Sequence, residues 1–311
     1  MKQEMSKDKM NGIINVYKEA GFTSHDVVAK LRGIAKQKKI GHTGTLDPDA
    51  EGVLPVCLGN ATKLCGLLSE KEKTYKAVLL LGQTTDTQDV SGKVLSVSEV
   101  KAEENEVQKT IESFLGDYDQ IPPMYSALKV GGKKLYELAR EGKEVERSAR
   151  RVRILDITIE WIRLPEVCFT VTCSSGTYIR TLCQDIGEKL GCGGCMKSLL
   201  RTRVDRFKLE DSLKLSQLEA LMREGRLEEA LLSVDQVLEN CPAVFMKPEA
   251  DKLVYNGNPF ADGQIKELPE VEEKELEERV RVYDSQGRFI GLYRRELRDK
   301  EGRFRPVKMF L

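Results

Sequence analysis

The sequence is poor in histidine, and this shortage limits the metal sites it can build. Its only histidines are His25 and His42. Cys192 and Cys195 have the CxxC spacing of some zinc and redox sites, but there is no second CxxC, and a four-ligand zinc site needs two more well-placed ligands. We therefore interpret the eight cysteines as reduced structural thiols and expect no metal.

Long apolar segments are also lacking. No stretch approaches the roughly 18 apolar residues that a membrane-spanning helix requires. The first residues, MKQEMSKDKMNGIINVYKEAG, lack the apolar centre of a signal peptide. With 40% hydrophobic and 32% charged residues, the 311-residue chain is expected to be a soluble cytoplasmic protein with one large and one small domain.

The chain has no net charge, because 50 Lys and Arg balance 50 Asp and Glu, so the total does not indicate a polyanionic partner. The charges are unevenly distributed, however. Basic residues dominate residues 30–39 and 129–153, whereas acids concentrate in residues 267–278. This distribution favours a protein that meets phosphates along one face, although either basic stretch alone also fits a solvated helix face.

Apolar periodicity predicts helices and strands over most of the chain. Ser24 is predicted to cap a helix that follows it, and Ser216 with Glu219 forms a capping-box pattern before another. The alternation over residues 152–161 slips by one residue near Leu155, which indicates a bulge. The remaining elements are expected as strands at 75–81 and 167–173, helices ending at Gly116 and spanning about 178–190, and a connecting loop at 83–92.

Composition changes near Cys241-Pro242. The acidic run at 267–278 is interpreted as a solvated linker or loop. Short strands are expected at 280–283, 289–293 and 307–310, with a turn at 284–287 between the first two. These patterns predict an α+β main domain followed by a small β-rich domain.

The densest local feature is the loop GHTGTLDP at residues 41–48. Its two glycines permit backbone shapes that other residues resist, and Pro48 stiffens the chain after Asp47. Such a loop can hold a carboxylate in a fixed, partly desolvated position. Loops of this composition are mostly simple turns, so the loop alone indicates only a candidate site.

The surrounding sequence resembles a known family. Residues 41–64, GHTGTLDPDAEGVLPVCLGNATKL, are similar almost residue for residue to the signature of the bacterial tRNA pseudouridine-55 synthases, the TruB family. Four further segments resemble that family's motifs in the same order: Lys73-Thr74-Tyr75, Pro122-Pro123-Met124-Tyr125-Ser126-Ala127-Leu128-Lys129, Ser175-Gly176-Thr177-Tyr178-Ile179-Arg180 and Leu200-Arg201-Thr202. The resemblance covers roughly residues 11–207.

The resemblance implies a role for each matching residue. Asp47 is expected to be the catalytic nucleophile or electrostatic catalyst, paired with Arg180, which keeps it ionised. Tyr75 is expected to stack on an extruded uracil. The other matching positions are expected to bind substrate: His42, Lys129, Tyr178 and Leu200.

The implied reaction is the isomerisation of the uridine at position 55 in the T-loop of tRNA. It breaks an N-glycosidic bond, turns the uracil and rejoins it through carbon, so it consumes no water and requires no cofactor. A carboxylate can act at the sugar carbon as it does in glycosidases, and one essential Asp in a dry pocket suffices because the base must be kept.

The family also implies an architecture. Residues 1–238 are expected to form a catalytic domain with a mixed or antiparallel sheet and an RNA-clamping insertion at about 84–150. Residues 239–311, which match less specifically, resemble its small RNA-binding PUA-type module. One departure is Asp205, which stands where the family usually has glycine. We expect a monomer.

Two other functions compete. A non-catalytic RNA-binding protein or tRNA folding chaperone would not need Asp47, and a chaperone role can coexist with catalysis. A nucleotide hydrolase would use the glycine-rich loop as a phosphate cradle, but GHTGTLDP lacks the Gly-Lys-Ser/Thr ending that places a lysine on phosphates.

Overall fold

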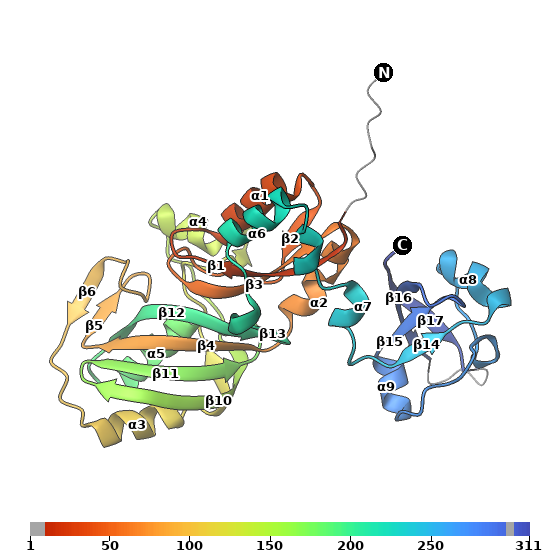
Figure 1. The fold of residues 1–311 in the computed structure, drawn as a ribbon. Helices are drawn as coiled ribbons and strands as arrows, with labels where there is room; N and C mark the ends of the chain where they lie inside the picture. Colours follow the sequence, from red (N-terminus) through yellow and green to blue (C-terminus); the bar gives the residue numbers. More distant parts are fainter. Residues whose placement is uncertain (1–9, 297–301) are drawn as a thin grey trace.

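The computed structural model describes residues 10–296 and 302–311, which are built around one long sheet (Figure 1). In this described part the sheet has nine strands, and its main path is β1-β3-β12-β4-β11-β10-β7, with β2 on β3 and β13 on β12. All pairs are antiparallel except β12 with β3. The strands span β1 Gly12–Lys18, β2 Ile40–His42, β3 Glu51–Leu58, β4 Lys73–Leu81, β7 Gly116–Gln120, β10 Arg150–Arg163, β11 Glu166–Cys173, β12 Gly194–Val204 and β13 Phe207–Lys208. The α+β class and mixed sheet predicted from the sequence are confirmed.

Two pairs of helices cover different halves of this sheet (Figure 1). Helices α1 (Ser24–Ala35) and α6 (Leu215–Arg223) share a hydrophobic cluster with β1 and β3. Helices α3 (Glu104–Glu112) and α5 (Ile179–Lys189) share another with β4, β10 and β11. Short helical segments complete the chain up to residue 250: η1 Gly59–Leu64, α2 Cys65–Ser69, η2 Leu209–Asp211, η3 Leu227–Ala230, α7 Val234–Val237 and η4 Pro248–Ala250.

The predicted helix starts need correction, whereas the predicted bulge is confirmed. Thr23, not Ser24, caps α1, because the Thr23 hydroxyl accepts a hydrogen bond from the backbone of Asp26 and Ser24 is already helical and buried. The capping box proposed at Ser216 is wrong, since α6 starts at Leu215. The bulge is present: the register between β10 and β11 shifts across Leu155.

The range predicted as an insertion holds two kinds of structure. Helix α3 and strand β7 join the main core and the long sheet. The remainder consists of small elements outside that sheet: β5 Gln83–Thr85, β6 Val94–Val97, β8 Lys129–Val130, β9 Lys133–Lys134 and α4 Leu135–Arg140. The stretch 83–92 predicted as a plain loop therefore begins with a strand of a short hairpin.

The C-terminal segment has a four-stranded sheet of its own, in the order β14-β15-β16-β17, with a separate hydrophobic cluster. Its elements are β14 Ala243–Phe245, α8 Asp251–Tyr255, η5 Asp262–Gln264, α9 Glu273–Glu278, β15 Val280–Tyr283, β16 Phe289–Arg295 and β17 Phe304–Met309. The last part of the acidic run is thus a helix rather than a loop.

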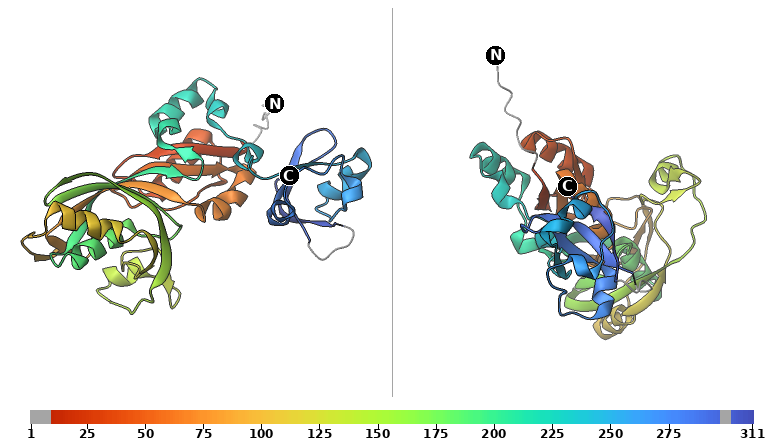
Figure 2. Two further views of the ribbon diagram at one scale, coloured as in Figure 1. Left: turned by 90° about the horizontal axis from the view of Figure 1, so that it is seen from below. Right: turned by 90° about the vertical axis from the view of Figure 1, so that its right-hand side faces the viewer.

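This second sheet lies beside the nine-stranded sheet rather than on top of it (Figure 2, left). The Asn60 side chain donates hydrogen bonds to the backbone oxygens of Phe310 and Leu311, and the Lys63 ammonium donates one to that of Met309. The C-terminal strand is therefore fastened to η1 of the first sheet's domain. None of the helices described is long and apolar enough to cross a membrane.

Candidate active site

A cavity of about 680 Å³ opens between the loop before β3, the strands β4 and β12, the start of α5 and the segment leading into β8. Residues predicted from sequence to form the site gather in its wall: Asp47, Tyr75, Tyr178 and Arg180. A cavity of this size suits a nucleotide-sized ligand. The residues come from three separate parts of the chain, the loop before β3, strand β4 and the start of α5, so the fold itself assembles the site.

The loop that carries Asp47 is fixed by contacts beneath it. The buried Lys18 ammonium donates hydrogen bonds to the backbone oxygens of Pro48, Phe22 and Glu19, at 2.9, 2.6 and 3.1 Å. The Ser24 hydroxyl accepts a hydrogen bond from the backbone N–H of Leu46 at 2.9 Å. These contacts hold the loop against β1 and α1 and leave the Asp47 side chain 39% exposed at the cavity.

Arg180 lies opposite Asp47, in the first turn of α5, with its side chain 6% exposed. Its Nε is 3.0 Å from Asp47 Oδ2, and its Nη2 is 3.4 Å from Asp47 Oδ1. The same guanidinium donates hydrogen bonds to the backbone oxygens of Thr87 and Tyr125, each at 2.8 Å. The pairing expected from the sequence is therefore present, in a guanidinium fixed by two further segments.

A second carboxylate also faces Arg180. Asp89 Oδ2 lies 3.7 Å from Arg180 Nη1. Its other oxygen, Oδ1, accepts hydrogen bonds from the hydroxyls of Thr87 and Ser91, at 2.7 and 2.6 Å, and from the Ser91 backbone N–H at 3.0 Å. The Asp89 side chain is thus held in place by Thr87 and Ser91 while its other oxygen faces the guanidinium.

The electrostatic balance at Asp47 is set by opposing effects. Burial raises the pKa of the Asp47 carboxyl, the Arg180 guanidinium lowers it, and the Asp89 carboxylate raises it again. The net direction is upward. Arg180 therefore offsets only part of the desolvation, which is a weaker effect than the sequence led us to expect.

Tyr75 and Arg201 form the floor of the cavity from adjacent strands, β4 and β12, where they are paired residues. Burial raises the pKa of the Tyr75 phenol, and the neighbouring Arg201 guanidinium opposes that rise. Arg201 is buried and donates hydrogen bonds to the backbone oxygens of Val53 and Gly44, at 2.7 and 3.2 Å. One residue thus supports both the tyrosine and the Asp47 loop.

The close approach of β12 to β3 requires glycine at position 52. A Cβ added there would lie 2.2 Å from the backbone oxygen of Arg201, and the Gly52 φ of +107° is unfavourable for other residues. Gly52 pairs directly with Arg201 across the parallel ladder. The glycine therefore allows the strand carrying Arg201 to reach the loop.

The remaining predicted substrate-binding residues lie at the edge of the cavity or outside it. Leu200 is half-buried in β12, between the cavity-lining residues Leu199 and Arg201. His42 is half-buried, with its ring edge-on to that of His25 at 5.4 Å, and burial lowers the pKa of its imidazole. Lys129 is exposed on β8. Their roles stay predictions.

Several residues of the site were missed by the sequence reasoning: Asp89, Tyr125, Ser126 and Arg201. Arg201 and the pair Tyr125 and Ser126 stood inside recognised motifs, which was the available signal. Asp89 lay in the stretch interpreted as a plain loop, where closely spaced Asp, Ser and Thr are typical of side chains that bond to a folded backbone. Cys192 and Cys195, the CxxC pair, are buried thiols.

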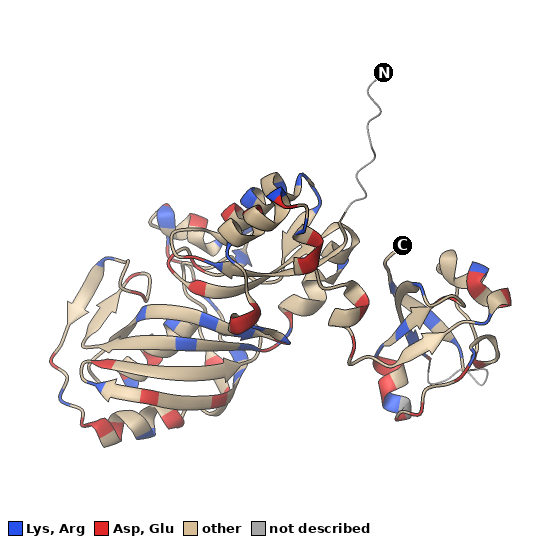
Figure 3. Cartoon of the chain, viewed as in Figure 1, with Lys and Arg blue, Asp and Glu red and all other residues tan. Residues whose placement is uncertain are grey.

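Charge on the surface near the site is uneven (Figure 3). Lys30, Arg32, Lys36, Lys38 and Lys39, which form the basic stretch of α1 and the following loop, are all exposed. In the second basic stretch many charges are already matched. Arg151 and Arg153 of β10, for example, pair with Asp119 and Asp117 of the neighbouring β7. The first stretch is therefore the better surface for phosphates.

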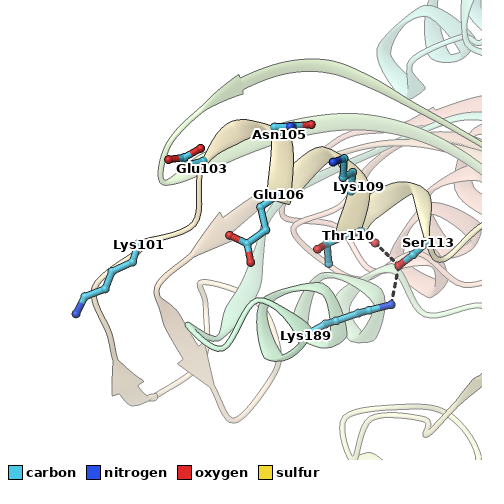
Figure 4. A pocket seen from close by; sticks show the side chains of 8 residues that line it. All are labelled: Lys101, Glu103, Asn105, Glu106, Lys109, Thr110, Ser113 and Lys189. Carbon is cyan, nitrogen blue, oxygen red and sulfur yellow. Dashed lines mark hydrogen bonds between the residues drawn. The ribbon is translucent and has the colours of Figure 1, made fainter.

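A second hollow, of about 530 Å³, lies between α3 and α5 on the outer side of the sheet (Figure 4). It is lined by Lys101, Glu103, Asn105, Glu106, Lys109, Thr110, Ser113 and Lys189. The Ser113 hydroxyl donates a hydrogen bond to the Thr110 backbone oxygen and accepts one from Lys189, so these three residues of the lining already bond to one another. The hollow is separate from the Asp47 cavity and shares no lining residue with it.

Comparisons with known proteins agree on one family. The model of the TruB family pseudouridylate synthase N-terminal domain matches residues 32–179, and that of the tRNA pseudouridylate synthase B C-terminal domain matches residues 180–239. A protein of Lachnoclostridium phytofermentans named tRNA pseudouridine synthase B is 54% identical over 97% of this chain and all of its own length. One of the same name from Clostridium novyi is 47% identical over 91% of this chain and 95% of its own length.

A solved structure gives the same picture for the fold. A chain in the crystal structure of a Cbf5-Nop10-Gar1 complex superposes with a TM-score of 0.74 and 28% identity, covering 96% of this chain and 85% of that one. The similarity extends through both sheets of the present structure.

Proposed function

The chain belongs to the TruB family of pseudouridylate synthases, and from this we propose that it converts uridine to pseudouridine at position 55 in the T-loop of tRNA, with Asp47 as the catalytic carboxylate. Isomerisation of uridine in tRNA is the activity named for its relatives. The position and the catalytic residue are the finer parts of the proposal.

The observation that carries the proposal is the Asp47–Arg180 pair at the wall of a nucleotide-sized cavity. A flipped uridine in this cavity brings its ribose C1′ to the Asp47 carboxylate, which attacks it or stabilises the cationic sugar as the N-glycosidic bond breaks. The uracil turns and its C5 bonds to C1′, which releases the Asp47 carboxylate from C1′ if it has attacked there; the proton of C5 is then lost to the surroundings while N1 gains one.

Arg180 and Tyr75 have separate roles in this proposal. Arg180 opposes the effect of burial on the pKa of Asp47 and so favours the ionised carboxylate. Tyr75 provides a buried aromatic face for the uracil, and its phenol stays protonated because burial raises its pKa. Asp89 is not a second acid, because Thr87, Ser91 and Arg180 already engage its oxygens.

The surroundings of the site support an RNA substrate. The exposed basic stretch at 30–39 follows the start of α1, which braces the Asp47 loop. We assign residues 239–311 as an additional RNA-binding module, supported by their separate sheet and core and by their attachment to η1. We further propose that the protein acts on tRNA as a monomer in the cytoplasm.

The test is to incubate the protein with unmodified tRNA and map pseudouridine chemically. Pseudouridine should appear at position 55 with wild type and with the control Asp211→Asn, which changes an exposed Asp of η2. Asp47→Asn should abolish it while still binding tRNA. Modification elsewhere would refute the position, and full activity of Asp47→Asn would refute the catalytic role and favour a non-catalytic RNA-binding protein.

A further inference from the structure

Ser126 has a buried hydroxyl that the fold leaves unused. The residue is 5% exposed, and within the described structure its Oγ has no hydrogen-bond partner. Leaving a buried hydroxyl unpaired costs about 1–3 kcal/mol, and native proteins keep few such groups. Ser126 also lines the same cavity as Asp47 and Arg180. An unpaired hydroxyl in the wall of a substrate cavity indicates a group that a ligand completes.

The backbone around Ser126 is held by hydrogen bonds, which fixes the position of its Cβ in the cavity wall. The Ser126 N–H donates to the backbone oxygen of Met124 at 3.0 Å, and its own backbone oxygen accepts from the N–H of Tyr136 at 3.1 Å. The preceding residue, Tyr125, accepts a hydrogen bond from Arg180 Nη2 through its backbone oxygen. The segment is thus tied to the guanidinium that pairs with Asp47.

Tyr178 lies next to this hydroxyl. Burial raises the pKa of the Tyr178 phenol and the Ser126 hydroxyl opposes that rise, so the two groups lie near each other, yet no hydrogen bond of ordinary geometry joins them. The Gln120 side chain holds both the backbone N–H and the backbone oxygen of Tyr178, at 2.7 and 3.0 Å. These two bonds fix the backbone of Tyr178 next to Ser126, at the wall of the cavity.

We propose that the Ser126 hydroxyl binds the ribose 2′-hydroxyl of the target nucleotide, which makes Ser126 a specificity-determining residue for RNA. The proposal rests on the proposed function, in which Asp47 acts at ribose C1′. Arg180 Nη2 contacts both Asp47 Oδ1 and the Tyr125 backbone oxygen, so Ser126 lies at the sugar end of the cavity. The 2′-hydroxyl is on the carbon next to C1′, and a hydroxyl both donates and accepts, as its partner must.

The experiment combines a change in the protein with a change in the RNA. Equilibrium binding is measured in the Asp47→Asn background, so that the RNA is not converted, with T-arm stem-loops carrying uridine or 2′-deoxyuridine at the target position. Ser126→Ala should weaken binding of the uridine RNA about fivefold, as loss of one hydrogen bond does. For the protein that keeps Ser126, removing the 2′-hydroxyl from the RNA should weaken binding by the same factor. Combining Ser126→Ala with the 2′-deoxyuridine RNA should weaken binding no more than either change alone.

The proposal would be overturned if the two changes together weakened binding by the product of their separate factors. It would also be overturned if the Ser126→Ala protein bound the uridine RNA as tightly as its parent. The thermal midpoint separates a structural role: Ser126→Ala should not lower it, because the hydroxyl has no protein partner to lose. Ser113→Ala, in the hollow between α3 and α5 (Figure 4), is the matched control and should bind both RNAs like its parent. If the uridine RNA did not bind at all, the T-arm substrate and this proposal would both be overturned, whereas residual activity of Asp47→Asn would count against the catalytic assignment alone.

Discussion

Arg180 and Asp47, 133 residues apart in sequence, meet through two nitrogen–oxygen contacts, Nε to Oδ2 at 3.0 Å and Nη2 to Oδ1 at 3.4 Å. Asp47 belongs to the loop braced by Lys18 and α1, whereas Arg180 is fixed by backbone oxygens of Thr87 and Tyr125. The ion pair therefore joins the two halves of the catalytic domain at the cavity. Neither partner can move without disturbing the segments that hold the other.

Arg180→Lys should lower kcat/KM by about 100-fold, comparable to the loss of one preorganised donor to a reacting charge. A lysine ammonium cannot reach Asp47 and both backbone oxygens in the planar arrangement that the guanidinium provides. Steady-state kinetics on unmodified tRNA give the measurement, with Arg223→Lys on the exposed face of α6 as the control. Activity within threefold of wild type would show that the planar arrangement of the guanidinium is not needed.

Activity should fall as the pH is lowered, and the pH at which kcat/KM reaches half its maximum should lie above the ordinary aspartate pKa of about 4. Asp47 must be ionised to act, and its pKa is raised by burial and by Asp89. Asp89→Asn removes the negative charge near Asp47, so that Arg180 is no longer shared between two carboxylates. The pKa of Asp47 should therefore fall, and the loss of activity should move to lower pH. The pH profile of kcat/KM for both proteins is the measurement. A shift toward higher pH would mean that Asp89 acts on Asp47 mainly through another group.

Sequence patterns identified the cavity residues that stand within a motif and have a reactive or aromatic side chain, such as Asp47, Tyr75 and Arg180. They did not identify Asp89 or Ser126. These depend on the close approach of distant segments. Asp89, in the segment after β5, meets Arg180, and Ser126 is recognisable only because its hydroxyl is buried with no hydrogen-bond partner among the described residues. Periodicity located the bulge at Leu155, because a side-chain alternation records a register shift directly.

Gly52→Ala should destabilise the protein and impair the site together. The added methyl would overlap the Arg201 backbone oxygen, and the positive φ adds strain, so we expect a loss of about 3 kcal/mol in the free energy of unfolding. Because β12 must move away, Arg201 would release the loop oxygen of Gly44. Denaturant unfolding measures the loss. Gly33→Ala, at an exposed helical glycine with open space around its Cβ, is the control and should not destabilise.

Asp205→Gly should stabilise the protein. Asp205 occupies the first central position of the two-residue turn between Val204 and Phe207, with φ +50°, a conformation that glycine adopts without strain. This explains why the family usually has glycine there.

The gain is expected to be about 0.5–1 kcal/mol in the free energy of unfolding, since relief of strain outweighs the extra freedom of glycine in the unfolded chain. Asp205→Ala, which lacks the polar group that makes aspartate tolerable at positive φ, should be less stable than wild type. Urea unfolding of the three proteins gives the order. If Asp205→Gly were the least stable of them, the aspartate side chain would have to contribute more through its attraction to the nearby buried Lys73 than the turn loses in strain.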